Sequence, residues 1–215
     1  MSNEPAPHSG DEAQHVGGAS ELEKADVAIG AKLASQRDRP LVKAAGKASK
    51  LGDQQPLYAI SAGVLIVGLV SRNRRLACSG GAMLAAVGAA DLSKRLAKAL
   101  VRRTRPHVLL DEHRYDSDTG GSERKPEQSF PSGHTACSVA AARALSRDYP
   151  RAGVAAGLAA TAIGVSRVAK GAHWPLDVLG GAVVGLAAEA LSQSLFQVAM
   201  RYRHQVYRWA RRVTE

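Results

Sequence analysis

Long runs with almost no charged residues constrain the fold of this 215-residue chain more than any other feature. Four runs are nearly charge-free: residues 57–70, 76–90, 152–165 and 178–200, the last with a single Glu189. A shorter run, residues 135–146, contains Arg143. Each clean run is shorter than the roughly 20 apolar residues of a membrane-spanning helix, so core helices of a soluble domain are the alternative.

A membrane-embedded bundle explains these runs better than a soluble core does. Four or five nearly charge-free helices exceed what one small soluble domain needs, and aromatic residues make up only 4% of the chain. Glycines four residues apart, as in Gly153/Gly157 and Gly181/Gly185, permit the close helix contacts of membrane bundles. The sequence therefore predicts an all-α, membrane-embedded helical bundle of about five core helices over residues 55–200.

Arginines cluster at those ends of the runs that would share one side of the membrane. They are Arg72, Arg74, Arg75, Arg147, Arg151, Arg201, Arg203, Arg208, Arg211 and Arg212. Positively charged loops face the cytoplasm. We therefore expect a multi-pass cell-membrane protein with a cytoplasmic basic tail, residues 201–215. Residues 93–134 and 166–175 would lie on the non-cytoplasmic face.

The N-terminal quarter has a different character. Residues 1–20 are polar, acidic and rich in Pro, Gly and Ser, without an apolar segment typical of a signal peptide, and predict a disordered tail. Residues 21–36 and 41–51 carry apolar residues at helical spacing, with Leu22, Ala25, Ile29 and Leu33 on one face. Residues 21–54 therefore predict amphipathic helices suited to a membrane or protein surface.

The net charge of +10 indicates anionic partners: phosphate compounds, acidic lipid or nucleic acid. Stacking platforms for nucleic-acid bases need aromatic residues, which are scarce here. We therefore expect a membrane and a phosphate compound as partners, and no nucleic acid. The oligomeric state has no sequence signal.

The first group of candidate site residues is KALVRRTRP, residues 98–106. Lys98 and Arg105 are seven residues apart, so both cations would project from one side of a helix that Pro106 ends. A basic stripe beside lipid headgroups is the alternative interpretation. Residues 107–130, which follow, predict a polar loop.

The second group is PSGH, residues 131–134, directly before an apolar run. A Pro-Ser-Gly turn that starts a helix leaves backbone N–H groups free, and such a helix end attracts anions. His134 would stand beside that anion. A helix cap with a surface histidine is the alternative interpretation.

The third group is SRVAKGAHWPLD, residues 166–177. Arg167 ends an apolar run, and His173 precedes a helix that Pro175 can start. Asp177 follows His173 by one helical turn, so its carboxylate can accept a hydrogen bond from the ring and orient it. A histidine and an aspartate at this spacing, without further site residues, more often make a structural polar contact.

Together the three groups resemble the three-part signature of the type 2 phosphatidic acid phosphatase family: Lys-x₆-Arg-Pro, Pro-Ser-Gly-His and Ser-Arg-x₅-His-x₃-Asp. That superfamily includes bacterial acid phosphatases and vanadium-dependent haloperoxidases. The resemblance covers roughly residues 55–200. Many membrane members have six spanning helices, whereas about five are expected here.

The resemblance implies a role for each residue of the signature. Phosphate oxygens would be held by Lys98, Arg105, Ser132, Gly133 and Arg167. His173 would be the nucleophile that takes the phosphoryl group, with its tautomer fixed by Asp177. His134 would protonate the leaving oxygen and then activate water. Three cationic side chains and a helix N-terminus can balance the negative charge of the phosphate, so no metal and no cofactor are expected.

The implied function is that of an integral-membrane phosphatase acting on a lipid phosphate or isoprenoid (di)phosphate through a phosphohistidine. Phosphatidate, phosphatidylglycerol phosphate, undecaprenyl diphosphate and a polyprenyl-phosphate sugar phosphate all fit. A soluble acid phosphatase or haloperoxidase with the same site is the first alternative. A basic membrane-binding or nucleic-acid-binding protein is the second, and it leaves the two histidines and Asp177 unexplained.

Overall fold

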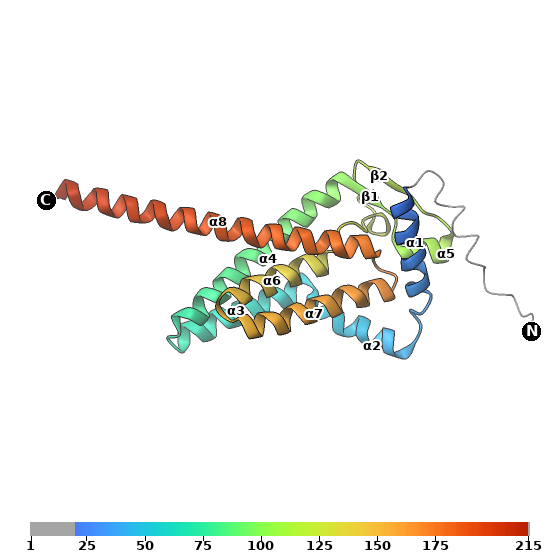
Figure 1. Cartoon of the computed structure of the whole chain (residues 1–215), viewed down its shortest axis with the longest axis horizontal. Coiled ribbons are helices and arrows are strands. Elements are labelled where there is room, and N and C mark those ends of the chain that lie inside the picture. The colour runs from blue at the N-terminus through green and yellow to red at the C-terminus, as the bar shows by residue number, and fades with distance from the viewer. Residues whose placement is uncertain (1–19, 215) are drawn as a thin grey trace, which may run out of the picture.

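The structure is a computed structural model that describes residues 20–214, with side chains up to Val198. The bundle consists of α3 (Gln54–Val70), α4 (Arg74–Leu100), α6 (Gly133–Asp148), α7 (Pro150–Ala169) and α8 (Pro175–Thr214). At one end lie α1 (Glu21–Ala34), α2 (Pro40–Ala48), η2 (Ser49–Gly52), β1 (Val101–Arg103), α5 (Pro106–Glu112), β2 (Ser117–Thr119) and η3 (Lys125–Glu127). The predicted five-helix bundle is confirmed (Figure 1).

The predicted N-terminal tail falls outside the described residues, apart from Ser20. The Ser20 hydroxyl accepts a hydrogen bond from the Glu23 N–H and so caps α1. At the other end of the chain, α8 continues through the predicted basic tail to Thr214.

Helix α6 lies at the centre of the bundle and contacts α3, α4, α7 and α8. Its buried residues are small: Thr135, Ala136, Cys137, Ser138, Ala140, Ala141, Ala142 and Ala144. Small residues let the helix axes approach closely. A Cβ at Gly181 would lie 2.5 Å from the Ser132 carbonyl oxygen, and one at Gly185 would lie 2.4 Å from that of Ala136. The predicted close packing is confirmed there and at Gly153, but is wrong for Gly157, where a Cβ would meet nothing within 4 Å.

Within the described residues, three helices are long and apolar enough to cross a membrane: α4, α7 and the first part of α8, Pro175–Val198. The segment Pro40–Gly52 meets α3 at a 54° bend, and the two pass the same test as a broken pair. Large apolar side chains on the outer faces are exposed, including Val70 at 81%, Leu158 at 68% and Val183 at 66%. These faces suit lipid rather than water.

Two arginine-rich turns lie at the same end of the bundle, as the sequence predicts (Figure 1). The Arg75 guanidinium donates to the Asp148 carbonyl and lies 4.8 Å from the Tyr149 ring centroid, which joins the α3–α4 turn to the α6–α7 turn. Arg147 pairs with Glu189 through two hydrogen bonds, of 2.5 and 3.1 Å. The single acidic residue of the last apolar run, Glu189, is therefore buried but paired with an exposed arginine.

The opposite end differs from the prediction in one respect. The helix that carries Lys98 ends at Leu100 rather than at Pro106, because Val101–Arg103 pair antiparallel with Ser117–Thr119. Pro106 instead starts α5, and it restricts Arg105 to an extended backbone. The predicted polar loop, residues 107–130, thus contains all of α5 except Pro106, together with β2 and η3.

The face of α1 that packs against the bundle consists mainly of small residues. Val27, Ala31 and Ala34 are buried, and a Cβ at Gly30 would lie 2.4 Å from the Trp174 ring. The predicted apolar face points outward: Leu22 is 67% exposed and Ile29 is 55% exposed. That face therefore remains available to a membrane surface.

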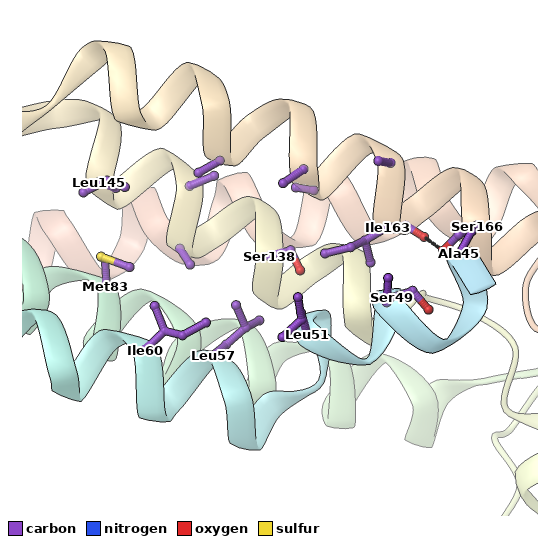
Figure 2. Close-up of a pocket in the computed structure, with 17 residues that line it drawn as sticks. Ala45, Ser49, Leu51, Leu57, Ile60, Met83, Ser138, Leu145, Ile163 and Ser166 are labelled. Carbon is purple, nitrogen blue, oxygen red and sulfur yellow. Dashed lines mark hydrogen bonds between the residues drawn. The ribbon is translucent and has the colours of Figure 1, made fainter.

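An apolar cavity of about 480 Å³ lies between the segment Pro40–Gly52 and helices α3, α6 and α7 (Figure 2). About half of the residues that line it are alanines, and Leu51, Leu57 and Ile163 are among the others. Because a cavity of about 150 Å³ holds a benzene ring, this one has room for a much longer hydrocarbon.

Candidate active site

The three sequence groups meet at the end of the bundle that carries the β strands. A second cavity, of about 370 Å³, is lined there by Gly52, Asp53, Gln54, Lys94, Lys98, Arg105, Lys125, Gly133, His134, Arg167 and His173. Five of these side chains are cationic, and Asp53 is the one carboxylate among the described residues that line it. The pocket is therefore built for an anion.

Lys98 and Arg105 come together without sharing a helix. Lys98 lies in the last turn of α4 and Arg105 precedes α5, yet both donate to the Gln128 carbonyl, at 2.5 and 3.5 Å. The sequence indicated that the two cations lie two turns apart on one helix. In the structure the pairing of β1 with β2 brings them to the Gln128 carbonyl instead.

Two of the arginines have unused hydrogen-bond donors. The buried Nε atoms of Arg105 and Arg167 have no partner among the described residues. Burial and the nearby Arg167 charge lower the pKa of the Arg105 guanidinium. Uncompensated positive charge of this kind favours binding of an anion.

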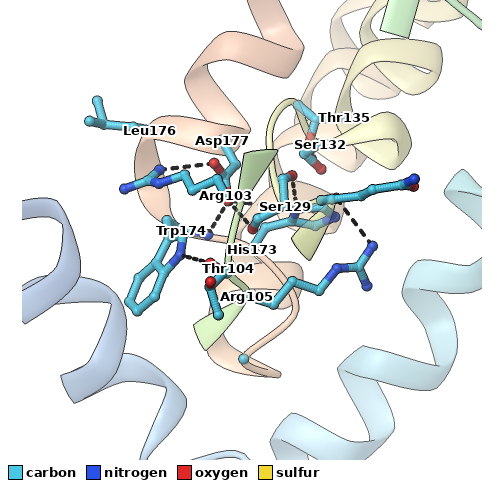
Figure 3. A network of polar contacts seen from close by, with 12 residues as sticks. Arg103, Thr104, Arg105, Ser129, Ser132, Thr135, His173, Trp174, Leu176 and Asp177 are labelled. Carbon is cyan, nitrogen blue, oxygen red and sulfur yellow. Dashed lines mark hydrogen bonds and ion pairs between the residues drawn. The ribbon is translucent and has the colours of Figure 1, made fainter. Parts of the chain in front are cut away.

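The start of α6 forms one wall of the pocket. The first hydrogen bond within the helix is from the Ala136 N–H to the Ser132 carbonyl, so the N–H groups of Gly133 and His134 precede it. Ser132 itself is fully buried, and its hydroxyl accepts from Thr135 at 3.0 Å. Gly133 lines the pocket, whereas the Ser132 side chain points to Thr135 (Figure 3).

His173 lies between α7 and α8 and is only 3% exposed. Its Nδ1 is 2.8 Å from the Ser129 carbonyl, so it carries the proton and Nε2 holds the lone pair. Burial lowers the pKa of His173 to about 4, in spite of the Asp177 carboxylate. The imidazole is therefore neutral at physiological pH, as a nucleophile requires.

Asp177 acts on His173 less directly than the spacing predicts. Its Oδ2 lies 3.8 Å from Nδ1, and it accepts from the Ser129 hydroxyl at 2.5 Å and from the Trp174 N–H at 2.7 Å. Ser129 therefore links the carboxylate to the ring (Figure 3), because its hydroxyl contacts Asp177 while its carbonyl accepts from His173.

His134 faces the same pocket from α6. Its Nε2 lies 2.6 Å from the Asp53 carboxylate, at the start of α3. Burial and the positive charge of Arg167 lower the pKa of His134 to about 3. His134 is thus a neutral imidazole at neutral pH, and it becomes imidazolium only when further negative charge, such as a bound anion, offsets the surrounding cations.

Sequence reasoning did not identify several residues of the site. Asp53, Ser129 and Arg103 contact the predicted residues, and Arg103 donates to Asp177 at 2.9 Å. Arg103 stands in the basic stretch between Lys98 and Arg105, but nothing in the spacing separates it from its neighbours. Among the described residues, no group of three or more His, Cys, Asp or Glu side chains could hold a metal ion.

The model of the PAP2 superfamily matches residues 79–201, more than half of the chain. The chain belongs to the PAP2 superfamily. Two non-specific acid phosphatases, from Salmonella typhi and Salmonella typhimurium, are 37% and 36% identical to it over 99 residues. These residues are 46% of this chain and only 39% of each relative, so the match spans about two fifths of the relatives' length.

Solved structures of membrane PAP2 proteins share the fold. The transmembrane PAP2-type phosphatidylglycerolphosphate phosphatase from Bacillus subtilis is 25% identical, with a TM-score of 0.57 over 86% of this chain and 90% of that one. Aquifex aeolicus LpxE is 23% identical, with a TM-score of 0.53 over 77% of this chain and 93% of that one. The fold is therefore that of a membrane-embedded PAP2 bundle.

Proposed function

We propose that this PAP2 protein is an integral-membrane phosphatase that hydrolyses a lipid phosphate or isoprenoid (di)phosphate through a phosphohistidine. The observation that carries the proposal is the pair of histidines facing one cationic pocket, His173 and His134. Their surroundings differ: His173 has a fixed tautomer, and His134 contacts a half-exposed carboxylate. Different environments suit one ring to attack and the other to proton transfer.

The reaction follows in two steps. Nε2 of His173 attacks phosphorus, the bond from phosphorus to the leaving oxygen breaks, and that oxygen takes a proton from His134. A water molecule then gives a proton to His134 while its oxygen attacks phosphorus, which breaks the phosphorus–nitrogen bond and releases phosphate. Lys98, Arg105 and Arg167 offset the negative charge that builds up on the phosphoryl oxygens.

The apolar cavity of Figure 2 supports a lipid substrate. Gly52 and Arg167 line the phosphate pocket, while their chain neighbours Leu51 and Ser166 line the apolar cavity. A lipid could place its phosphate in one and a hydrocarbon chain in the other. A soluble phosphatase or haloperoxidase needs neither this cavity nor the exposed apolar faces of the bundle.

The experiment that tests the proposed function uses the purified protein in detergent. The four lipids named above would be supplied in excess EDTA, with and without vanadate. We expect phosphate release to persist with EDTA, since the cations of the pocket can balance the charge, and to fall with vanadate, which mimics the transition state. Loss of release on chelation, restored by magnesium, would contradict metal independence.

A larger side chain in the apolar cavity should slow hydrolysis of lipid substrates but not of soluble ones. Ala160 is buried on α7 and lines the cavity, so Ala160→Leu should lower kcat/KM for long-chain lipid phosphates by about tenfold, corresponding to about 1.4 kcal/mol. p-Nitrophenyl phosphate, which has no chain, should be turned over at the wild-type rate. Ala155→Leu, on the exposed face of the same helix, is the matched control. An equal loss of kcat/KM on both substrates would argue against binding of a lipid hydrocarbon chain in the cavity.

We also propose that the pocket faces the non-cytoplasmic side of the cell membrane. The arginine-rich turns lie at the opposite end of the bundle, and positive loops face the cytoplasm. A tag on the C-terminus should then be reached by antibody only after permeabilisation of the cells.

A further inference from the structure

Helix α1 contributes a buried carboxylate to the active-site end of the bundle. The family match begins at Ser79, so α1 lies outside it. Asp26 on α1 is only 4% exposed, although most of the apolar side chains on its own helix face outward. A charged group is buried in this way only when it is paired and hydrogen-bonded.

The partners of Asp26 come from two elements of the site. Oδ2 accepts from Nη2 of Arg103 at 2.6 Å, and Oδ1 accepts from the Leu176 N–H at 2.8 Å, in the first turn of α8. That turn also carries Asp177. Asp26 therefore holds both the arginine and the helix start that together place Asp177.

Arg103 connects Asp26 to the hydrogen bonds that hold His173, the proposed nucleophile. It is 5% exposed and lies 5.7 Å from the Trp174 ring centroid. Its Nη1 donates to Asp177 Oδ1 at 2.9 Å, while its Nη2 is bound to Asp26. Asp177 in turn accepts from Ser129, whose carbonyl holds the His173 ring.

We propose that Asp26 is a positioning residue of the active site: it fixes the Arg103 guanidinium, which holds Asp177 and, through Ser129, the ring of His173. This role rests on the function proposed above. Without the Asp26 charge, a buried guanidinium with one carboxylate instead of two can turn away from Asp177. The His173 ring then loses the restraint that aims Nε2 at phosphorus.

Asp26→Asn tests the role, because it keeps the size of the side chain and removes its charge. We expect kcat for p-nitrophenyl phosphate, and the rate of phosphohistidine formation, to fall about 10- to 100-fold, as a small misplacement of reacting groups does. KM should change little, because Lys98, Arg105 and Arg167 are not among the contacts of Asp26. Asp26→Glu, which restores the charge, should recover part of the loss.

Asp111→Asn is the matched control. Asp111 pairs with Arg37 at 2.5 Å and so also ties the N-terminal segment to α5, but it lies outside the network of Asp177. A purely structural role for Asp26 predicts that both variants lower Tm while kcat per folded molecule stays at the wild-type value, and that result would overturn the proposal. An equal loss of kcat in Asp111→Asn would overturn it too.

Arg103→Lys provides a second variant if Asp26→Asn does not accumulate in membranes. Lysine keeps the charge but cannot bridge two carboxylates with a planar fork, so the same loss of kcat is expected. Wild-type kcat in Arg103→Lys would contradict the proposal. An inactive wild-type protein would contradict the proposed function, whereas full activity of both wild type and Asp26→Asn would contradict only the role of Asp26.

Discussion

His173→Ala should reduce phosphate release by a factor on the order of 10⁴ or more and leave no phosphoenzyme, because the nitrogen that takes the phosphoryl group is gone. The measurement is single-turnover hydrolysis of a radiolabelled phosphate substrate, quenched in base, where phosphohistidine is stable. A fully inactive variant with an unchanged melting temperature would show that the loss is chemical rather than structural.

His107→Ala is the matched control for His173→Ala. The His107 ring contacts the Gly171 carbonyl at 3.1 Å, in the same turn that carries His173, but His107 does not line the pocket. This variant should keep most of its activity. Substantial activity in His173→Ala would refute its assignment as the nucleophile.

His134→Ala should slow turnover of lipid phosphates by a factor of about 10² to 10⁴, the usual contribution of a general acid and base. With p-nitrophenyl phosphate the first step should suffer less, because that leaving group needs little protonation. The second step still lacks its base, so a phosphohistidine should accumulate. Peptide mapping of the trapped label should place it at His173, and a label at any other residue would contradict the assignment.

The charge-free runs predicted the bundle well because, in a membrane, hydrophobicity alone largely decides which segments are helical. The same reasoning failed at Leu100, where helical spacing from Lys98 to Arg105 was compatible with a continuous helix. The pairing of β1 with β2 ends that helix, and a partner strand 16 residues further along leaves no trace in the local pattern. Here the pairing of two strands, rather than helix propensity or residue spacing, decides where the helix ends.

The signature residues were found because their spacing is local, and the structure brings most of them to one pocket. Asp26 and Asp53 were missed because they meet the site only in three dimensions. Arg103 lies 77 residues from Asp26 in the chain, and no periodicity connects them. The Asp177 side chain was expected to bind His173 directly, but Ser129 intervenes, and its hydroxyl carries no sequence signal that sets it apart from other serines.

The outward face of α1 has a consequence for how substrate reaches the pocket. Leu22, Ile29 and Leu33 project away from the bundle on the helix that holds Arg103, and Leu41 on the next helix is 80% exposed. Side chains of this kind settle at the boundary between headgroups and acyl chains. This face would place the candidate active site at headgroup depth. With the function proposed above, a lipid phosphate would then arrive by lateral diffusion within the leaflet. Encounter would depend on how densely the lipid is packed in that surface, and hardly at all on its concentration in the surrounding water.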